Sequence, residues 1–185
     1  MRTPLTILVA LLIVSAGIGI YIILVGGFTD TEVRILVTSG VLNVYTVLMM
    51  PSLFHARGSR YSYLTRFATA STSITLVMIL LLIWGSESTG GTISFLKSLI
   101  SFAVLAVASN HCLVLLIARP RKLVVRISQK TTIVIIALVA TFLVLAIWNE
   151  GITGPLLRAF LALAVLGALG SVATPILFKA TESDS

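Results

Sequence analysis

The chain has 185 residues, of which 58% are hydrophobic and only 10% are charged, and it carries a formal net charge of +7. Soluble domains contain about 25% charged residues, so this composition excludes a soluble globular protein and indicates an integral membrane protein. The positive charge could suggest a nucleic-acid partner, but the basic residues lie between long apolar stretches, and we expect no nucleic acid to bind. The single cysteine, Cys112, excludes an internal disulfide and a cysteine metal cluster.

Six apolar stretches follow one another along the chain, and each is long enough to cross a bilayer as a helix. The first, residues 5–25, would form a helix of roughly 31 Å at about 1.5 Å per residue. A secretory signal peptide is the competing interpretation, because the chain starts with a short basic segment, but the apolar run is too long for one. We therefore predict an all-α protein with six transmembrane helices, at residues 5–25, 33–54, 67–84, 93–117, 131–148 and 155–178, and a polar tail at 180–185.

One sequence pattern occurs three times in the chain. Each copy begins with a basic residue and continues with a large apolar residue two places on, a small residue six places on, and then a Val-Leu pair. The basic residues are Arg34, Lys97 and Arg158, so the spacings are 97 − 34 = 63 and 158 − 97 = 61 residues. A nearly constant period of this size indicates an internal repeat. We therefore predict a single membrane domain, 1–185, with repeats at 1–60, 61–122 and 123–179.

The predicted repeats define an arrangement in the membrane. Each holds two spans joined by a short connection, so we expect three repeated antiparallel helical hairpins, which could surround a pseudo-threefold axis as a six-helix bundle. Ten basic residues lie with the termini and the connectors between repeats, and three lie on the other side. By the positive-inside rule, both termini are expected in the cytoplasm, with Trp84 and Trp148 at the outer interface. We expect an integral protein of a prokaryotic plasma membrane.

Few polar residues fall within the predicted spans, and no Asp, Glu, Lys or Arg lies in the middle of one. Proton relays and ion-coupled transporters usually place such a residue there, and the sequence has no catalytic triad, nucleotide loop or metal-ligand spacing. We therefore expect no catalytic residue, metal or cofactor. Three residues form a candidate intramembrane polar site: Asn43, Asn110 and His111. They could bind a ligand or a proton, or they could hydrogen-bond to neighbouring helices as packing contacts.

The three repeated basic residues form a second candidate site. Arg34, Lys97 and Arg158 each begin the second helix of a predicted hairpin, where a positive charge opposes the helix dipole. If the repeats close around an axis, the three side chains could converge on an anion or a lipid headgroup at the outer surface. The alternative is that each reaches lipid phosphate separately or pairs with a nearby acidic residue: Asp30, Glu32, Glu87 or Glu150.

These observations leave three functional hypotheses. The first is a non-catalytic membrane subunit or scaffold of a larger complex, whose partners are the lipid bilayer and other membrane subunits or further copies of the chain. The second is a small-solute or ion transporter or channel, with a path lined by the polar residues of the spans. The third is a histidine-dependent redox or haem-binding membrane protein, for which His55 is the only second histidine.

Overall fold

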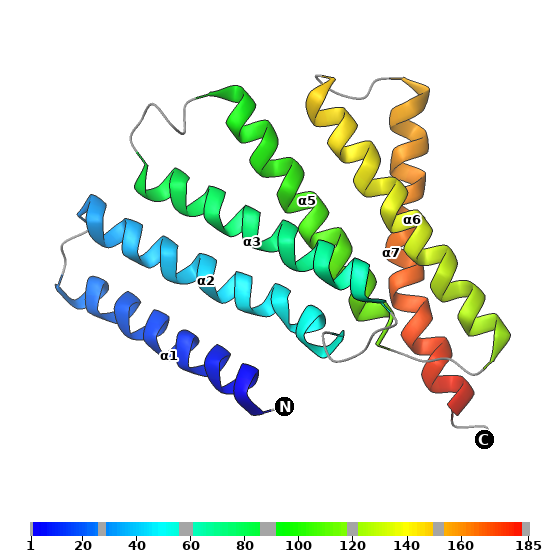
Figure 1. The fold of residues 1–185 in the computed structure, drawn as a ribbon, viewed down its shortest axis with the longest axis horizontal. Helices are drawn as coiled ribbons and strands as arrows, with labels where there is room; N and C mark the ends of the chain where they lie inside the picture. The colour runs from blue at the N-terminus through cyan, green and yellow to red at the C-terminus, as the bar shows by residue number, and fades with distance from the viewer. Residues whose placement is uncertain are drawn as a thin grey trace.

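The computed structural model of the protein describes residues 2–25, 29–55, 61–85, 92–117, 122–149 and 154–182. Over these ranges the chain is all-helical and forms six helices (Figure 1). In chain order they are α1 (Arg2–Val25), α2 (Asp30–His55), α3 (Ser62–Trp84), α5 (Ile93–Leu115), α6 (Leu123–Trp148) and α7 (Pro155–Glu182). The N-terminus of α1 and the C-terminus of α7 lie at the same end of the molecule (Figure 1).

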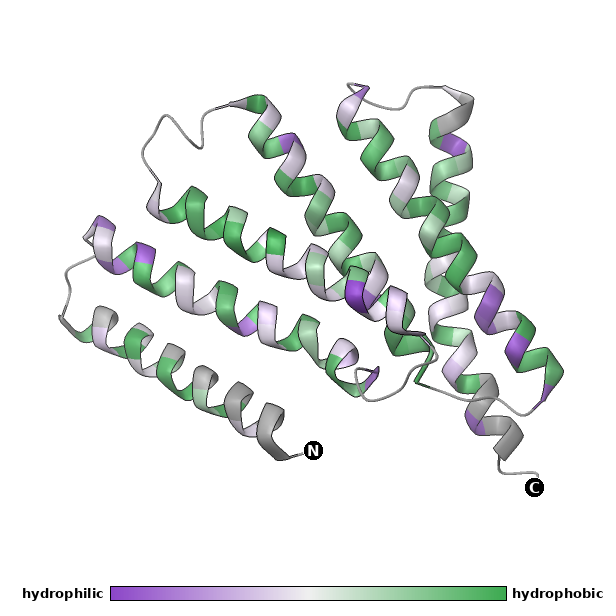
Figure 2. Cartoon of the chain, viewed as in Figure 1, coloured by the Kyte–Doolittle hydropathy of each residue, from purple (hydrophilic) through white to green (hydrophobic). Residues whose placement is uncertain are grey.

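Five of the helices are long and apolar enough to cross a membrane: α2, α3, α5, α6 and residues Leu157–Ile176 of α7. A membrane span needs about 20 mainly apolar residues. Figure 2 shows apolar residues along these helices, with much of the hydrophilic colour near the helix ends. The prediction of an all-α protein with helices suited to a membrane is therefore confirmed. The helix α1 has 24 residues but is not among the five, so a sixth span stays a prediction.

Several helices begin before the predicted spans do. Hydropathy marks where the hydrocarbon core begins, whereas a helix starts where its first N–H groups find partners. At the start of α2, the backbone N–H of Glu32 donates to the Thr29 hydroxyl at 3.4 Å, and the Thr29 N–H donates to the Glu32 carboxylate at 2.9 Å. This reciprocal pair is a capping box, and it begins α2 ahead of the predicted residue 33. The helices α3 and α6 likewise extend into the predicted basic connectors.

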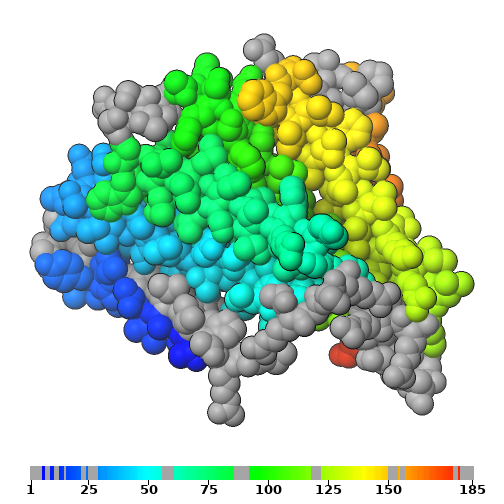
Figure 3. Space-filling view, viewed as in Figure 1, coloured from blue at the N-terminus to red at the C-terminus, as the bar shows by residue number. Residues whose placement is uncertain are grey.

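The helices follow one another in space as they do in the chain. Each consecutive pair is in extensive contact, and α5 also contacts α2 and α7, so that α5 touches four other helices. Figure 3 shows α3 in the middle of one face, with α1 and α6 towards opposite edges. The helix α5 is the most buried of the five apolar helices, because neighbours surround it on several sides. It is therefore the central element of the fold.

The described part of the chain does not form a closed ring of hairpins. A pseudo-threefold bundle requires the first and third pairs of helices to meet, but no extensive contact joins α1 or α2 to α6 or α7. The ribbons instead spread as an open row around α5 (Figure 1). Lipid tails are as apolar as leucine side chains, so the outer faces of α1 and α7 can remain uncovered by protein without a hydrophobic penalty in a membrane.

Small residues allow α6 and α7 to pack closely. A Cβ atom added at Gly170 of α7 would collide with the side chain of Thr132 of α6, including its Cγ2 atom at 3.0 Å. One turn away, the hydroxyls of Ser128 and Thr174 lie 3.4 Å apart across the same interface. Close approach of helix backbones through small residues is the usual way in which helices associate in lipid.

Candidate functional site

The buried side chain of Asn110 joins three helices. It is 2% exposed, and its carbonyl oxygen accepts a hydrogen bond from the Ser52 hydroxyl of α2 at 3.0 Å. Its amide donates to the Thr72 hydroxyl of α3 at 2.9 Å and to the Ala106 carbonyl of its own helix at 2.9 Å. Both amide hydrogens are thus in use. The geometry makes Asn110 a packing contact between α5, α2 and α3.

His111 is the next residue, but it belongs to a different face of α5. Its Nε2 atom lies 2.9 Å from the Ser171 hydroxyl of α7, and the ring is only partly buried. Ser171 donates its own hydrogen to the Gly167 carbonyl at 2.7 Å. A serine hydroxyl has one hydrogen, so Nε2 of His111 must be the donor to Ser171. No hydrogen bond to Nδ1 of His111 occurs among the described residues.

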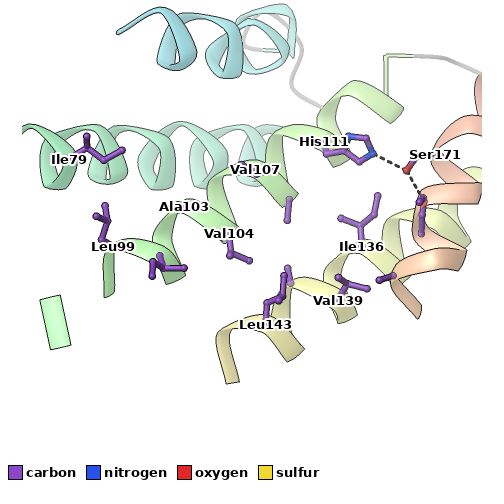
Figure 4. Close-up of a pocket in the computed structure, with 16 residues that line it drawn as sticks. Ile79, Leu99, Ala103, Val104, Val107, His111, Ile136, Val139, Leu143 and Ser171 are labelled. Carbon is purple, nitrogen blue, oxygen red and sulfur yellow. Dashed lines mark hydrogen bonds between the residues drawn. The ribbon is translucent and has the colours of Figure 1, made fainter. Parts of the chain in front are cut away.

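His111 and Ser171 lie at one end of a groove between the helices (Figure 4). The groove has a volume of about 790 Å³ and is walled by α5, α6, α7 and one residue of α3, Ile79. The other lining residues are apolar, and six of them are small: Ala103, Ala108, Ala140, Ala164, Gly167 and Ala168. Because these side chains are short, space remains between helices that are otherwise in contact. We call this space the α5–α7 groove.

A second cavity of about 490 Å³ lies on the other side of α5, between α5, α2 and α3. Its walls include Gly40, Tyr45 and Thr72, and it shares Ile79, Ala103 and Val107 with the α5–α7 groove. The hydroxyls of Tyr45 and Ser73 lie 3.4 Å apart beside it and form another link between α2 and α3. The helix α5 is therefore flanked by two apolar spaces.

The structure does not gather Asn43, Asn110 and His111 into one site. Asn43 lies nine residues before Ser52, the contact of Asn110, which is about 13 Å along α2 at 1.5 Å per residue. Its side-chain oxygen is buried without a hydrogen-bond partner among the described residues. Asn110 binds α2 and α3, whereas His111 faces the α5–α7 groove. The three predicted residues therefore occupy three different environments.

The repeated basic residues are also separate. Arg34 and Arg158 are exposed near the starts of α2 and α7, and Lys97 is partly buried near the start of α5. The starts of these helices lie apart in Figure 1, and no ion pair involves the three residues within the described ranges. The described helices therefore do not bring the three residues together at one point. The predicted partners Glu87 and Glu150 lie outside the described residues, and the individual lipid-headgroup contacts stay a prediction.

Two tryptophan contacts were not foreseen from the sequence, yet they follow the repeat. The indole N–H of Trp84 in α3 donates to the Thr38 hydroxyl in α2 at 2.9 Å, and that of Trp148 in α6 donates to the Ser101 hydroxyl in α5 at 3.2 Å. The acceptors lie four residues after Arg34 and Lys97, since 38 − 34 = 4 and 101 − 97 = 4. The repeat register, applied to polar residues, could have indicated this pair of contacts.

Other contacts had no signal in the sequence. The Gln129 amide of α6 donates to the Leu115 carbonyl at the C-terminal end of α5, a group that has no partner within its own helix. Ser171, the partner of His111, is one of many serines in the chain and has no distinguishing neighbours in the sequence. Comparisons with protein-family models, with curated proteins and with solved structures find no match for the chain.

Proposed function

We propose that the chain is a non-catalytic membrane subunit that acts as a scaffold for other transmembrane helices. The observation that carries this proposal is that polar side chains of the helices form hydrogen bonds with neighbouring helices. Asn110, Trp84, Trp148 and Gln129 all form hydrogen bonds between helices of the chain itself, which is how polar residues stabilise helix packing in lipid. A transporter or channel would instead require polar groups along a common path.

The free faces of the row supply the surface for a partner. The helix α1 has extensive contact only with α2, so most of its circumference is available to another membrane protein. Exposed apolar side chains on it include Ile13, at 67% exposure, and Leu24, at 79%. In this proposal the partner helices pack against α1, while α5 and its hydrogen bonds keep the remaining helices in place.

We further propose that the row consists of three related hairpins with both termini in the cytoplasm. The two tryptophan contacts support the repeat, because in each a tryptophan near the end of one helix donates to the residue four places after the repeated basic residue of the preceding helix. The distribution of basic residues supports the orientation.

Site-specific photo-crosslinking in native membranes tests the scaffold. A photoreactive amino acid at Ile13 of α1 is expected to give a discrete adduct with one other membrane protein. The matched control is Val77 of α3, which is 55% exposed on a helix flanked by α2 and α5, and it should give much less of that adduct. Adducts with lipid only, from both positions, would contradict a scaffold. An adduct with a second copy of the chain would assign the face to self-association.

A second candidate function, the binding or transport of a small molecule, is favoured by the α5–α7 groove. Its volume of about 790 Å³ lies within the range of roughly 300–1,000 Å³ that is usual for ligand sites.

A further inference from the structure

The α5–α7 groove has the shape for an elongated guest. It runs along α5 from Leu99 to His111, a separation of 111 − 99 = 12 residues, or about 18 Å at 1.5 Å per residue. Side chains of α6 and α7 form the remaining walls, as Figure 4 shows for Ile136, Val139, Leu143 and Ser171. An extended alkyl chain fits a space that is long and apolar.

Apolar lining alone would not select a guest in a membrane. An alkyl chain that leaves the lipid for an apolar groove gains no hydrophobic free energy, because both surroundings are equally apolar. Preference must come from close packing and from a polar contact that the lipid tails cannot offer. The pair of His111 and Ser171 is the polar part of the groove lining.

The hydrogen-bonding state of this pair defines the complementary group. The hydrogen on Nε2 of His111 is used by Ser171, and the hydroxyl hydrogen of Ser171 is used by Gly167. The position that remains is an acceptor, one lone pair of the Ser171 oxygen. A guest with a hydrogen-bond donor can bind this lone pair, whereas the hydrogens of Nε2 and of the Ser171 hydroxyl are already in use.

We infer that the α5–α7 groove binds a long-chain alcohol or a lipid with a free hydroxyl, with its alkyl body along α5 and its hydroxyl at the His111–Ser171 pair. A hydroxyl that enters apolar surroundings without a partner is strongly disfavoured, so this contact fixes both the position and the direction of the guest. The binding site goes beyond the scaffold role, which concerns the outer face of α1.

The inference can be tested by photolabelling of the full chain in lipid nanodiscs. The probe is hexadecanol with a diazirine in its alkyl chain, and the matched probe is its methyl ether, which has the same body but no donor. The alcohol is expected to label groove residues about tenfold more than the ether at equal concentration, with adducts located by mass spectrometry. Equal labelling by the two probes would overturn the inference, and this comparison requires no substitution.

Variants of the chain localise the effect. Ala168→Leu fills the groove and should reduce labelling by the alcohol at least fivefold, whereas Ala162→Leu, on the exposed surface of the same helix but not lining the groove, should leave it unchanged. His111→Leu should bring labelling by the alcohol down to that by the ether. Labelling spread evenly over exposed residues of all helices would contradict the site. This result does not depend on whether α1 binds a partner, so the two proposals fail separately.

Discussion

Replacement of Asn110 by alanine should destabilise the fold by removing the hydrogen bonds that join α5 to α2 and α3. Two interhelical bonds are lost, one from the Ser52 hydroxyl at 3.0 Å and one to the Thr72 hydroxyl at 2.9 Å. Interhelical hydrogen bonds in membrane proteins average about 0.6 kcal/mol and reach about 1.7 kcal/mol. The free energy of unfolding should therefore fall by about 1–3 kcal/mol, and Ser52, which is 1% exposed, would need a new acceptor.

Ser109→Ala is the matched control. Ser109 is the preceding residue of α5 and is 6% exposed, but its hydroxyl bonds only to the Leu105 and Ala106 carbonyls of its own helix. Its loss should change the free energy of unfolding by less than about 0.5 kcal/mol, because such bonds within a helix contribute little. The assay is reversible unfolding in mixed detergent micelles, followed by circular dichroism. Equal effects of Asn110→Ala and Ser109→Ala would refute the argument that Asn110 joins the helices.

Three further predictions use the same unfolding assay. Gly170→Ala should destabilise the α6–α7 pair by about 1–3 kcal/mol, because the added Cβ collides with Thr132. Gly40→Ala, with no atom within 4 Å of the added Cβ, should be neutral or stabilising by up to about 1 kcal/mol. A larger loss of stability for Gly40→Ala than for Gly170→Ala would contradict the packing. Trp84→Phe and Trp148→Phe should each cost about 1 kcal/mol, because each loses one indole hydrogen bond, and a large inequality would argue against equivalent junctions. Thr29→Ala should cost about 1 kcal/mol by removing the cap of α2, and an unchanged helix content and stability would show that the capping box is dispensable.

The sequence predicted the helical elements well because burial in lipid requires long apolar runs. The predicted starts of α2, α3 and α6 were less accurate, since hydropathy locates the edge of the hydrocarbon core and not the first hydrogen-bonded turn. The capping residues Thr29 and Glu32 were visible in the sequence and would have placed the start of α2 correctly.

The arrangement of the repeats could not be derived from their similarity. A repeated unit with a head-to-tail contact forms a ring only if the rotation between units closes, and otherwise it forms an open row. The repeat spacing carries no information on that rotation. An indole hydrogen bond of Trp84 joins α3 to α2, one of Trp148 joins α6 to α5, and the described helices form an open row.

The structure places the three candidate polar residues in different surroundings for a simple geometric reason. Neighbouring residues on a helix do not face the same way, so Asn110 and His111 had to belong to different faces of α5. Asn110 found partners 58 and 38 residues away, and His111 found Ser171, 60 residues away. Contacts at such separations depend on how the helices pack, and this packing cannot be read from the spacing of residues in the sequence.

The scaffold proposal is tested most directly by the mass of the particle that contains this chain when it is taken from its native membrane. Extraction into polymer-bounded native nanodiscs, followed by native mass spectrometry, would measure that mass without detergent exchange. We expect a particle well above the chain mass of 19.7 kDa that contains at least one different membrane protein in fixed stoichiometry. A particle that contains one copy of the chain and lipid alone would contradict it.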